Sequence, residues 1–313
     1  MQKDKDMKNV LYDLAIVGAG PAGLNASVYA SRYGLKNVII GQVPGGLTTE
    51  THEIGNWLGT EKITGAEFAQ KAYQHAQNLK ADIKLNLVDN INKKDNHFKI
   101  ILDSKEEVLA RTILLALGSK HRKLNIPGEK ELAGKGVSYC ATCDGFFYKN
   151  KNVIVVGGSD SAAVAAIYLG DIAKKVYLIY RKNQLRAEKF WQKSILSNSK
   201  IEVIYNTNLL KIEGNNKVEK VILDNPYKNS KELKIDGVFV EIGSVPNNFL
   251  AKQLGIELDE DGYIKINADG STSLKGVWAA GDITTGSNKF KQIVTAAAEG
   301  AIAVNSIQNY LKK

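Results

Sequence analysis

The sequence predicts an α/β fold in which one strand–turn–helix–strand unit is inserted inside another. Three observations lead to this expectation: glycine-rich turns begin at Gly18 and Gly157, each turn follows a short apolar run, and each precedes a helix-like stretch that leads to a second apolar run. This order of elements is typical of Rossmann-like dinucleotide-binding domains. A length of 313 residues fits two such domains, at roughly 100–200 residues per domain.

The first unit joins two apolar runs through a glycine-rich turn and a helix-like stretch. Its parts occupy, in chain order, residues 13–17, 18–23, 24–33 and 38–40. In the turn, Gly18 permits the tight bend, Gly20 lets the backbone approach a pyrophosphate, and Gly23 lets the helix pack on the strand. The N-terminus of the helix then faces the phosphates. The second run ends at Gln42 rather than at the usual acidic residue, so the adenosine ribose must be held in another way.

The second unit repeats this order. Its parts occupy residues 153–156, 157–162, a helix that ends near residue 169, and residues 175–180. Three cations follow, Arg181, Lys182 and Arg186, where an acidic residue would indicate NAD. Only five of the 42 Lys and Arg residues are Arg, and two of them lie here, where a guanidinium suits bidentate phosphate contact. The cluster favours NADP, and a solvated basic turn is the alternative interpretation.

The only two cysteines of the chain lie in one motif, Cys140-Ala141-Thr142-Cys143, which Asp144 follows. One adjacent pair cannot form a disulfide framework or close a four-cysteine zinc site. Two thiols at this spacing can form a disulfide that opens and closes, as in a dithiol redox centre. Taken alone, the motif leaves a half-built metal site or two core cysteines as alternatives. We predict no metal site.

The charge and hydropathy pattern indicates neither a nucleic-acid nor a membrane partner. The net charge of +9 is spread along the chain without a long basic block, which favours a lysine-rich solvated surface. No apolar run approaches the roughly 20 residues needed to cross a bilayer. Residues 1–7 are polar and lack the apolar stretch of a signal peptide. We expect a cytoplasmic protein, in which a Cys-x-x-Cys motif is more often catalytic than structural.

A third signal lies near the end of the chain. Residues 276–282 read as a buried strand that delivers Asp282 to a turn, and an Ala-rich amphipathic helix follows at residues 291–311. An aspartate at such a turn can serve simply as a cap. With a glycine-rich nucleotide turn upstream, we favour a role for Asp282 in binding a cofactor.

Together these features resemble the low-molecular-weight thioredoxin reductases, and the resemblance covers residues 12–311. It rests on the motifs Gly18-Ala19-Gly20-Pro21-Ala22-Gly23, Gly45-Gly46, Asn56-Trp57, Cys140-Ala141-Thr142-Cys143-Asp144-Gly145, Arg181-Lys182 with Arg186, and Ala279-Ala280-Gly281-Asp282. The cysteine motif just ahead of a second nucleotide turn is highly specific. The resemblance implies a homodimeric flavoprotein, a class II pyridine nucleotide-disulfide oxidoreductase.

The resemblance also implies a path for electrons and a role for each catalytic residue. Electrons pass from NADPH through FAD to the Cys140–Cys143 dithiol, and then to the disulfide of thioredoxin or a thioredoxin-like protein. Cys143 faces the flavin, Cys140 attacks the substrate disulfide, and Asp144 acts as the general acid–base. For Asp144, a helix N-cap is the alternative role, and the two roles can coexist.

Crossings between the two domains are predicted at residues 119–127 and 243–248, where Gly, Pro and polar residues gather. The FAD-binding domain then covers residues 1–120 and 248–313, and the NADPH-binding domain, which carries the Cys-x-x-Cys motif, covers residues 121–247. The residues expected to bind FAD are Gly18, Gly20, Pro21, Ala22, Gly23, Gln42, Gly45, Gly46, Leu47, Asn56, Gly118, Gly281, Asp282, Lys291, Gln292 and Ile293. Those expected to bind NADPH are Gly157, Gly158, Ser159, Asp160, Ser161, Arg181, Lys182 and Arg186.

Three positions depart from the pattern of these reductases. Ser159 takes the place of the second glycine, Val164-Ala165 replaces the usual paired glutamates, and Leu47 replaces a usual Gln near the flavin. The first two motivate an alternative in which the same flavin and dithiol receive electrons from another donor, such as reduced ferredoxin. A third interpretation is a non-enzymatic redox or metal-sensing module built on the cysteine pair.

Overall fold

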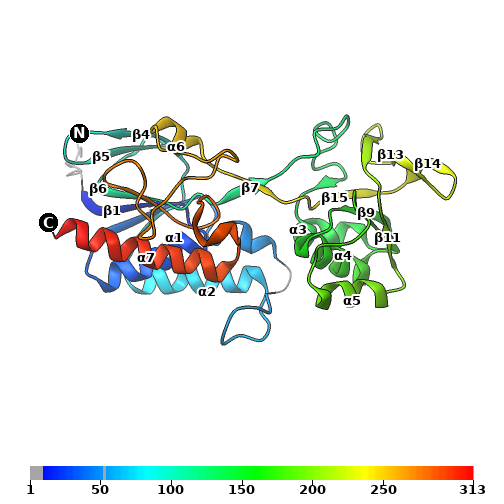
Figure 1. Cartoon of the computed structure of the whole chain (residues 1–313), viewed down its shortest axis with the longest axis horizontal. Helices are drawn as coiled ribbons and strands as arrows, with labels where there is room; N and C mark the ends of the chain where they lie inside the picture. The colour runs from blue at the N-terminus through cyan, green and yellow to red at the C-terminus, as the bar shows by residue number, and fades with distance from the viewer. Residues whose placement is uncertain (1–9, 52–53, 313) are drawn as a thin grey trace, which may run out of the picture. The chain divides into compact units, whose positions relative to one another are not determined.

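The structure, a computed structural model, describes residues 10–51 and 54–312 (Figure 1). The chain divides into two units. The first comprises Met1–Thr49, Ile54–Lys120 and Pro246–Lys313, and the second comprises Glu50–Glu53 and His121–Val245. The polar start expected at residues 1–7 lies outside the described residues. None of the helices within residues 10–51 and 54–312 has both the length and the hydropathy that crossing a bilayer requires.

The first unit is built on a seven-stranded sheet in the order β3-β2-β1-β6-β5-β4, with β17 paired to β6. Its strands are β1 (Leu11–Val17), β2 (Asn37–Ile40), β3 (Asp82–Lys84), β4 (Val88–Lys93), β5 (Phe98–Leu102), β6 (Glu107–Leu115) and β17 (Val277–Ala279). All neighbouring pairs are parallel except β4–β5 and β5–β6. Alternate residues of β1 enter two separate apolar clusters, so this strand is buried on both faces.

Helices cover this sheet. They are α1 (Pro21–Arg32), α2 (Gly65–Asn78), α6 (Phe249–Gln253) and α7 (Ile293–Leu311), with the short 3₁₀ turns η1 (Gly46–Glu50) and η3 (Gly286–Lys289). Figure 1 shows α1, α2 and α7 side by side. The approach of α7 to α1 is close, because a Cβ on Gly300 would lie 2.3 Å from the Ala22 carbonyl oxygen. Only glycine fits at that point of contact.

The second unit has a five-stranded parallel sheet in the order β11-β10-β9-β15-β8. Its strands are β8 (Val137–Ser138), β9 (Asn152–Val156), β10 (Lys175–Ile179), β11 (Ile201–Ile204) and β15 (Gly237–Val240). Its helices are α3 (Ala141–Asp144), η2 (Gly145–Tyr148), α4 (Asp160–Ile172) and α5 (Lys189–Ser197). A separate antiparallel sheet consists of β12 (Leu209–Glu213), β13 (Lys220–Tyr227) and β14 (Ser230–Lys234).

Both predicted crossings contain a short strand. These are β7 (Ser119–His121) and β16 (Ser244–Pro246), which pair as a two-stranded sheet. The predicted α/β class with one Rossmann-like unit inserted in another is confirmed, and the predicted elements are present with shifted ends. The first helix begins at Pro21 rather than at residue 24, because proline is well suited to the first helical position, where no intrahelical N–H bond is lost.

Candidate active site

The glycines of the first glycine-rich turn are needed for two different reasons. Gly18 has a φ of +119°, and a Cβ there would lie 2.1 Å from the Ala116 carbonyl oxygen. A Cβ on Gly23 would lie 1.9 Å from the Gly18 carbonyl oxygen. Gly20 differs, because its φ is −75° and a Cβ would meet nothing within 4 Å. The fold therefore requires Gly18 and Gly23, whereas Gly20 leaves open the space into which a pyrophosphate would fit.

Other residues expected to bind FAD gather around this turn. The Gly45 amide donates a 2.7 Å hydrogen bond to the Ala19 carbonyl, and a Cβ on Gly46 would lie 3.5 Å from Gly20 Cα. Pro21 and Ala22 form the first turn of α1. Leu47 lies half-buried in η1, whereas the Gln42 side chain is exposed. Gly118, with a φ of +59°, follows the end of β6.

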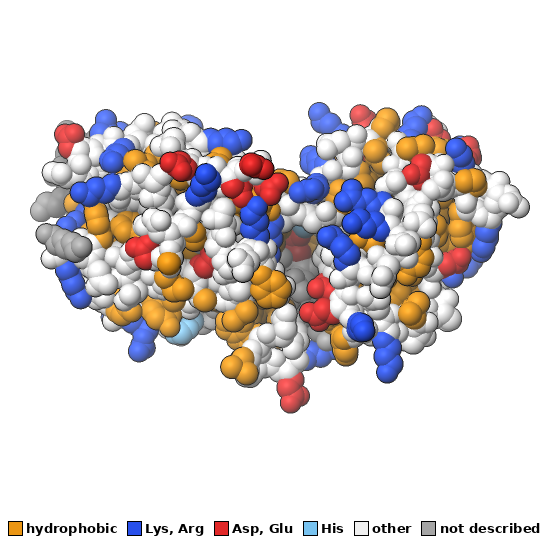
Figure 2. Space-filling model, viewed as in Figure 1, with side chains coloured by type: hydrophobic (Ala, Val, Ile, Leu, Met, Phe, Trp, Pro, Cys, Tyr) orange, Lys and Arg blue, Asp and Glu red, His pale blue; other side chains and the backbone are white. Residues whose placement is uncertain are grey.

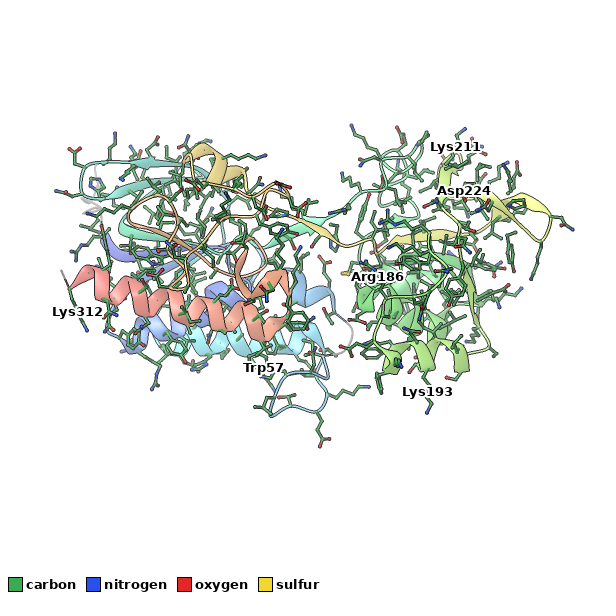
Figure 3. The ribbon with its side chains drawn as sticks, in the orientation of Figure 1. Trp57, Arg186, Lys193, Lys211, Asp224 and Lys312 are labelled. Atoms are coloured by element: carbon green, nitrogen blue, oxygen red, sulfur yellow. A yellow bond between two sulfur atoms is a disulfide. The ribbon has the colours of Figure 1, made fainter. Side chains whose placement is uncertain are left out.

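A second group of expected FAD residues lies at the start of α7. Gly281 follows β17, and a Cβ there would lie 3.0 Å from Ala22 Cβ, which places this turn against α1. Asn56 Nδ2 donates a 3.0 Å hydrogen bond to Gln292 Oε1, and Gln292 caps the helix that Ile293 begins. The neighbouring Trp57, which Figure 3 labels, belongs to the same motif as Asn56. It packs edge-to-face on Phe68 of α2, with ring centroids 5.2 Å apart.

Asp282 is a half-buried carboxyl with a cation nearby. Burial raises the pKa of Asp282 above its ordinary value, the charge of Lys291 opposes that shift, and the charge of Glu299 adds to it. Lys291 Nζ also donates a 2.5 Å hydrogen bond to the Tyr263 hydroxyl. Glu299 accepts hydrogen bonds from the Gly281 amide at 2.9 Å and the Thr284 hydroxyl at 2.8 Å. Sequence reasoning missed Glu299, because its partners lie 15 to 18 residues earlier in the chain.

The second glycine-rich turn has the same backbone course as the first. A Cβ on Gly157 would lie 2.1 Å from the Glu241 carbonyl oxygen, and one on Gly158 would lie 2.5 Å from the Tyr180 ring. Ser159 has φ −96° and ψ −177°, against −75° and −176° at Gly20. Its hydroxyl lies 3.2 Å from that of Ser161. The serine is therefore unstrained, and its side chain occupies the position that Gly20 leaves open in the first turn.

The three cations of the second unit lie on an exposed loop that is tied to this turn. Arg181, Lys182 and Arg186 are exposed, and within residues 10–51 and 54–312 none of them forms a salt bridge. The Arg186 amide donates a 2.7 Å hydrogen bond to the Gly158 carbonyl, and Asp160 Oδ1 accepts one of 2.7 Å from the Glu188 amide. Figure 2 shows Lys and Arg side chains gathered on the part of this unit where Figure 3 labels Arg186.

The two cysteines are joined in a disulfide of 2.03 Å at the start of α3. Cys143 is exposed and Cys140 is half-buried. The Cys143 amide donates a 3.0 Å hydrogen bond to Cys140 Sγ. Ser138, at the end of β8, accepts a 3.1 Å bond from the Cys140 amide and donates one of 3.2 Å to its carbonyl. An amide directed at Cys140 Sγ favours the thiolate form once the disulfide is open.

Asp144 is the last residue of α3 and directly precedes η2. Its side chain is half-buried and makes no capping hydrogen bond to η2, so the N-cap alternative has no support in the geometry. Burial, followed by the charges of Asp144 and Asp236, raises the pKa of Tyr148. Tyr148 packs edge-to-face on Phe239 of β15 at 5.1 Å, which anchors the end of the redox motif to the sheet.

A polar cluster that sequence reasoning did not foresee lies beside this motif. His121 Nε2 and Glu50 Oε2 are 2.7 Å apart, and this hydrogen bond raises the pKa of His121. The His121 ring lies 6.0 Å from the Tyr139 ring, and the Tyr139 hydroxyl donates a 2.8 Å bond to the buried Glu129. No local sequence signal joins residues 50, 121 and 139. In the described part of the chain, no three His, Cys, Asp or Glu side chains are grouped as metal ligands.

The fold and the site define a flavin- and nucleotide-linked disulfide reductase. Residues 12–300 match the pyridine nucleotide-disulphide oxidoreductase family, and the chain belongs to that family. Family members of the thioredoxin reductase type use FAD and NADPH. The chain is 40% identical over 307 residues to the thioredoxin reductase of Bacillus subtilis (strain 168), covering 97% of this chain and 96% of the relative.

Solved structures agree with this assignment. The thioredoxin reductase of Lactococcus lactis matches with a TM-score of 0.91 and 34% identity, covering 96% of this chain and 99% of that one. The thioredoxin reductase of T. acidophilum matches with a TM-score of 0.91 and 36% identity, covering 97% and 99%. The resemblance to low-molecular-weight thioredoxin reductases is therefore confirmed, and the alternative electron donor is not favoured.

Proposed function

We propose that the Cys140–Cys143 pair of this NADPH-dependent disulfide reductase passes electrons to the disulfide of thioredoxin or a thioredoxin-like protein. The observation that carries the proposal is the Cys140–Cys143 disulfide, which lies in the same unit as a nucleotide turn followed by three exposed cations. The residues around Gly20 fit FAD, because they leave open space in front of the helix N-terminus. When bound, FAD supplies two-electron chemistry between a nicotinamide and a disulfide.

The dithiol performs the exchange with the protein substrate. The Cys140 thiolate attacks one sulfur of the substrate disulfide, forms a mixed disulfide, and releases the other substrate sulfur as a thiolate. Cys143 then attacks the Cys140 sulfur, which restores the Cys140–Cys143 bond and releases the second substrate thiol. The amide of Cys143, 3.0 Å from Cys140 Sγ, supports Cys140 as the attacking sulfur. Asp144 supplies the proton that the departing thiolate takes up.

An exposed aromatic pair supports a protein substrate. Phe146 and Phe147 follow the redox motif directly and are 72% and 69% exposed. Large apolar side chains at such exposure are suited to contact with a partner protein. From the resemblance to the low-molecular-weight thioredoxin reductases we infer a homodimer. From the spread of charge and the hydropathy pattern we infer a cytoplasmic protein with neither nucleic acid nor membrane as a partner.

The test is an anaerobic titration of the FAD-loaded protein with NADPH, NADH and a chemical reductant, followed by addition of oxidised thioredoxin. We expect NADPH to bleach the flavin absorbance at lower concentration than NADH, and the reduced enzyme to reduce thioredoxin. If only the chemical reductant bleaches the flavin, and the enzyme reduced in this way still reduces thioredoxin, the alternative donor would be established. A protein that remains colourless after addition of FAD would refute the flavoprotein assignment.

A further inference from the structure

The two nucleotide turns differ in the residue that faces their first glycine. In the first unit this residue is Ala116, which follows β6, and in the second it is Glu241, which follows β15. Each carbonyl oxygen lies 2.1 Å from the Cβ that Gly18 or Gly157, respectively, would carry. The Ala116 amide donates a 2.7 Å hydrogen bond to the last carbonyl of β1, and the Glu241 amide donates one of 2.8 Å to the last carbonyl of β9. Glu241 therefore places a carboxyl where the first unit has only a methyl group.

This position lies at the carboxyl ends of the strands, where a dinucleotide binds. In doubly wound sheets the ligand occupies the crevice at the carboxyl ends of the strands, with its diphosphate at the helix N-terminus. The half-buried Glu241 side chain accepts a hydrogen bond from the hydroxyl of Ser161, in the first turn of α4. Ser161 is also among the residues expected to bind the nucleotide. The carboxyl and a bound diphosphate thus share one neighbour.

The groups around Glu241 hold it largely protonated at neutral pH. Burial raises its pKa to about 8, and the charge of Glu50, in η1, adds to the shift. The charge of His121, in β7, and the hydrogen bond from Ser161 oppose it. Asp160, also in the first turn of α4, accepts a hydrogen bond from the Glu188 amide. The glycines of the turn itself carry no charge.

We propose that Glu241 makes nucleotide binding by the second unit depend on pH: the protonated side chain accepts the anionic dinucleotide, and the ionised side chain repels it. This inference rests on the proposed role of the second unit as the NADPH site. It makes Glu241 an affinity-determining residue, because like charges at short range in a partly buried site repel strongly. The 2′-phosphate, which the exposed cations address, takes no part in the effect, so NADP⁺ and NAD⁺ should respond alike.

The size of the effect follows from linkage. If only the protonated form binds, the apparent dissociation constant is the intrinsic one divided by the protonated fraction. With a pKa of about 8, that constant should rise about tenfold between pH 7 and pH 9. Binding of NADP⁺ and NAD⁺ to the FAD-loaded full-length protein, measured by calorimetry at pH 7, 8 and 9, gives the values directly.

Two variants isolate the carboxyl. Glu241→Gln keeps its size and removes its charge, and Glu241→Ala restores the residue type of the first unit; both should bind with nearly constant affinity across this pH range. Glu232→Gln is the matched control, because Glu232 is an exposed acid of β14 paired with Lys220. It should keep the tenfold change. Flavin absorbance and melting temperature report whether each variant is folded.

The outcomes separate this inference from the function beneath it. Wild-type binding that is flat with pH, or a Glu241 variant that keeps the tenfold change, overturns the inference while the NADPH site stands. Absence of binding by wild type and all variants at every pH overturns both. Loss of the pH dependence in both Glu241 variants, with the control unchanged, supports it.

Discussion

Replacing Gly20 by alanine should weaken FAD binding while leaving the fold intact. The backbone at Gly20 has an ordinary φ of −75°, and a Cβ there meets nothing within 4 Å. The folding cost is that of alanine at a helix N-cap, about 1 kcal/mol. A bound pyrophosphate would meet the new methyl group, and overpacking of this kind costs about 1–3 kcal/mol. The dissociation constant of FAD should therefore rise by about five- to 150-fold.

The matched control is Gly18→Ala, only two residues away. Its φ is +119° and its Cβ would lie 2.1 Å from a backbone oxygen, so we expect destabilisation of about 4 kcal/mol or more. Apoprotein of each variant is melted and then titrated with FAD, with flavin fluorescence as the readout. A Gly20→Ala variant that binds FAD as tightly as wild type, or whose apoprotein is destabilised as much as that of Gly18→Ala, would refute the assigned role of Gly20.

Three further predictions concern the dithiol, the nucleotide and the half-buried Asp282. Cys140→Ser and Cys143→Ser should each abolish thioredoxin reduction yet retain flavin reduction by a chemical donor. Only Cys140→Ser should show a long-wavelength flavin absorption band. A band in Cys143→Ser alone would exchange the roles assigned to the two cysteines. Arg181→Ala should weaken the binding of NADPH about ten- to a hundredfold and leave that of NADH unchanged, since charged hydrogen bonds are worth about 1.5–3 kcal/mol. Ser159→Gly should strengthen the binding of both nucleotides. Equal losses of affinity for both nucleotides in Arg181→Ala would contradict the 2′-phosphate assignment. Because burial raises the pKa of Asp282, ionisation of this carboxyl costs folding stability as the pH rises from about 3.9. Asp282→Asn apoprotein should therefore melt at a higher temperature than wild type at pH 7, but bind FAD more weakly. An unchanged melting temperature would count against a destabilising charge at Asp282.

Much of the fold and part of the site could be predicted from the sequence, because their determinants are local. A glycine-rich turn between an apolar run and a helix specifies its backbone within six residues, as the matched angles of Gly20 and Ser159 illustrate. The Cys140–Cys143 pair is equally local, since only two residues lie between the cysteines and both belong to one turn of chain. Predictions of this kind need only spacing and residue type.

Contacts between distant segments could not be predicted, because no pattern in one segment indicates its partner in another. Glu50 and His121 are 71 residues apart, and Glu299 supports a turn 18 residues before it. The sequence alone therefore determined the two nucleotide turns, the dithiol and the cations after β10. Only the tertiary structure placed the Glu241 backbone against Gly157, because β9 and β15, which are parallel neighbours far apart in the chain, have their carboxyl ends on the same side of one sheet.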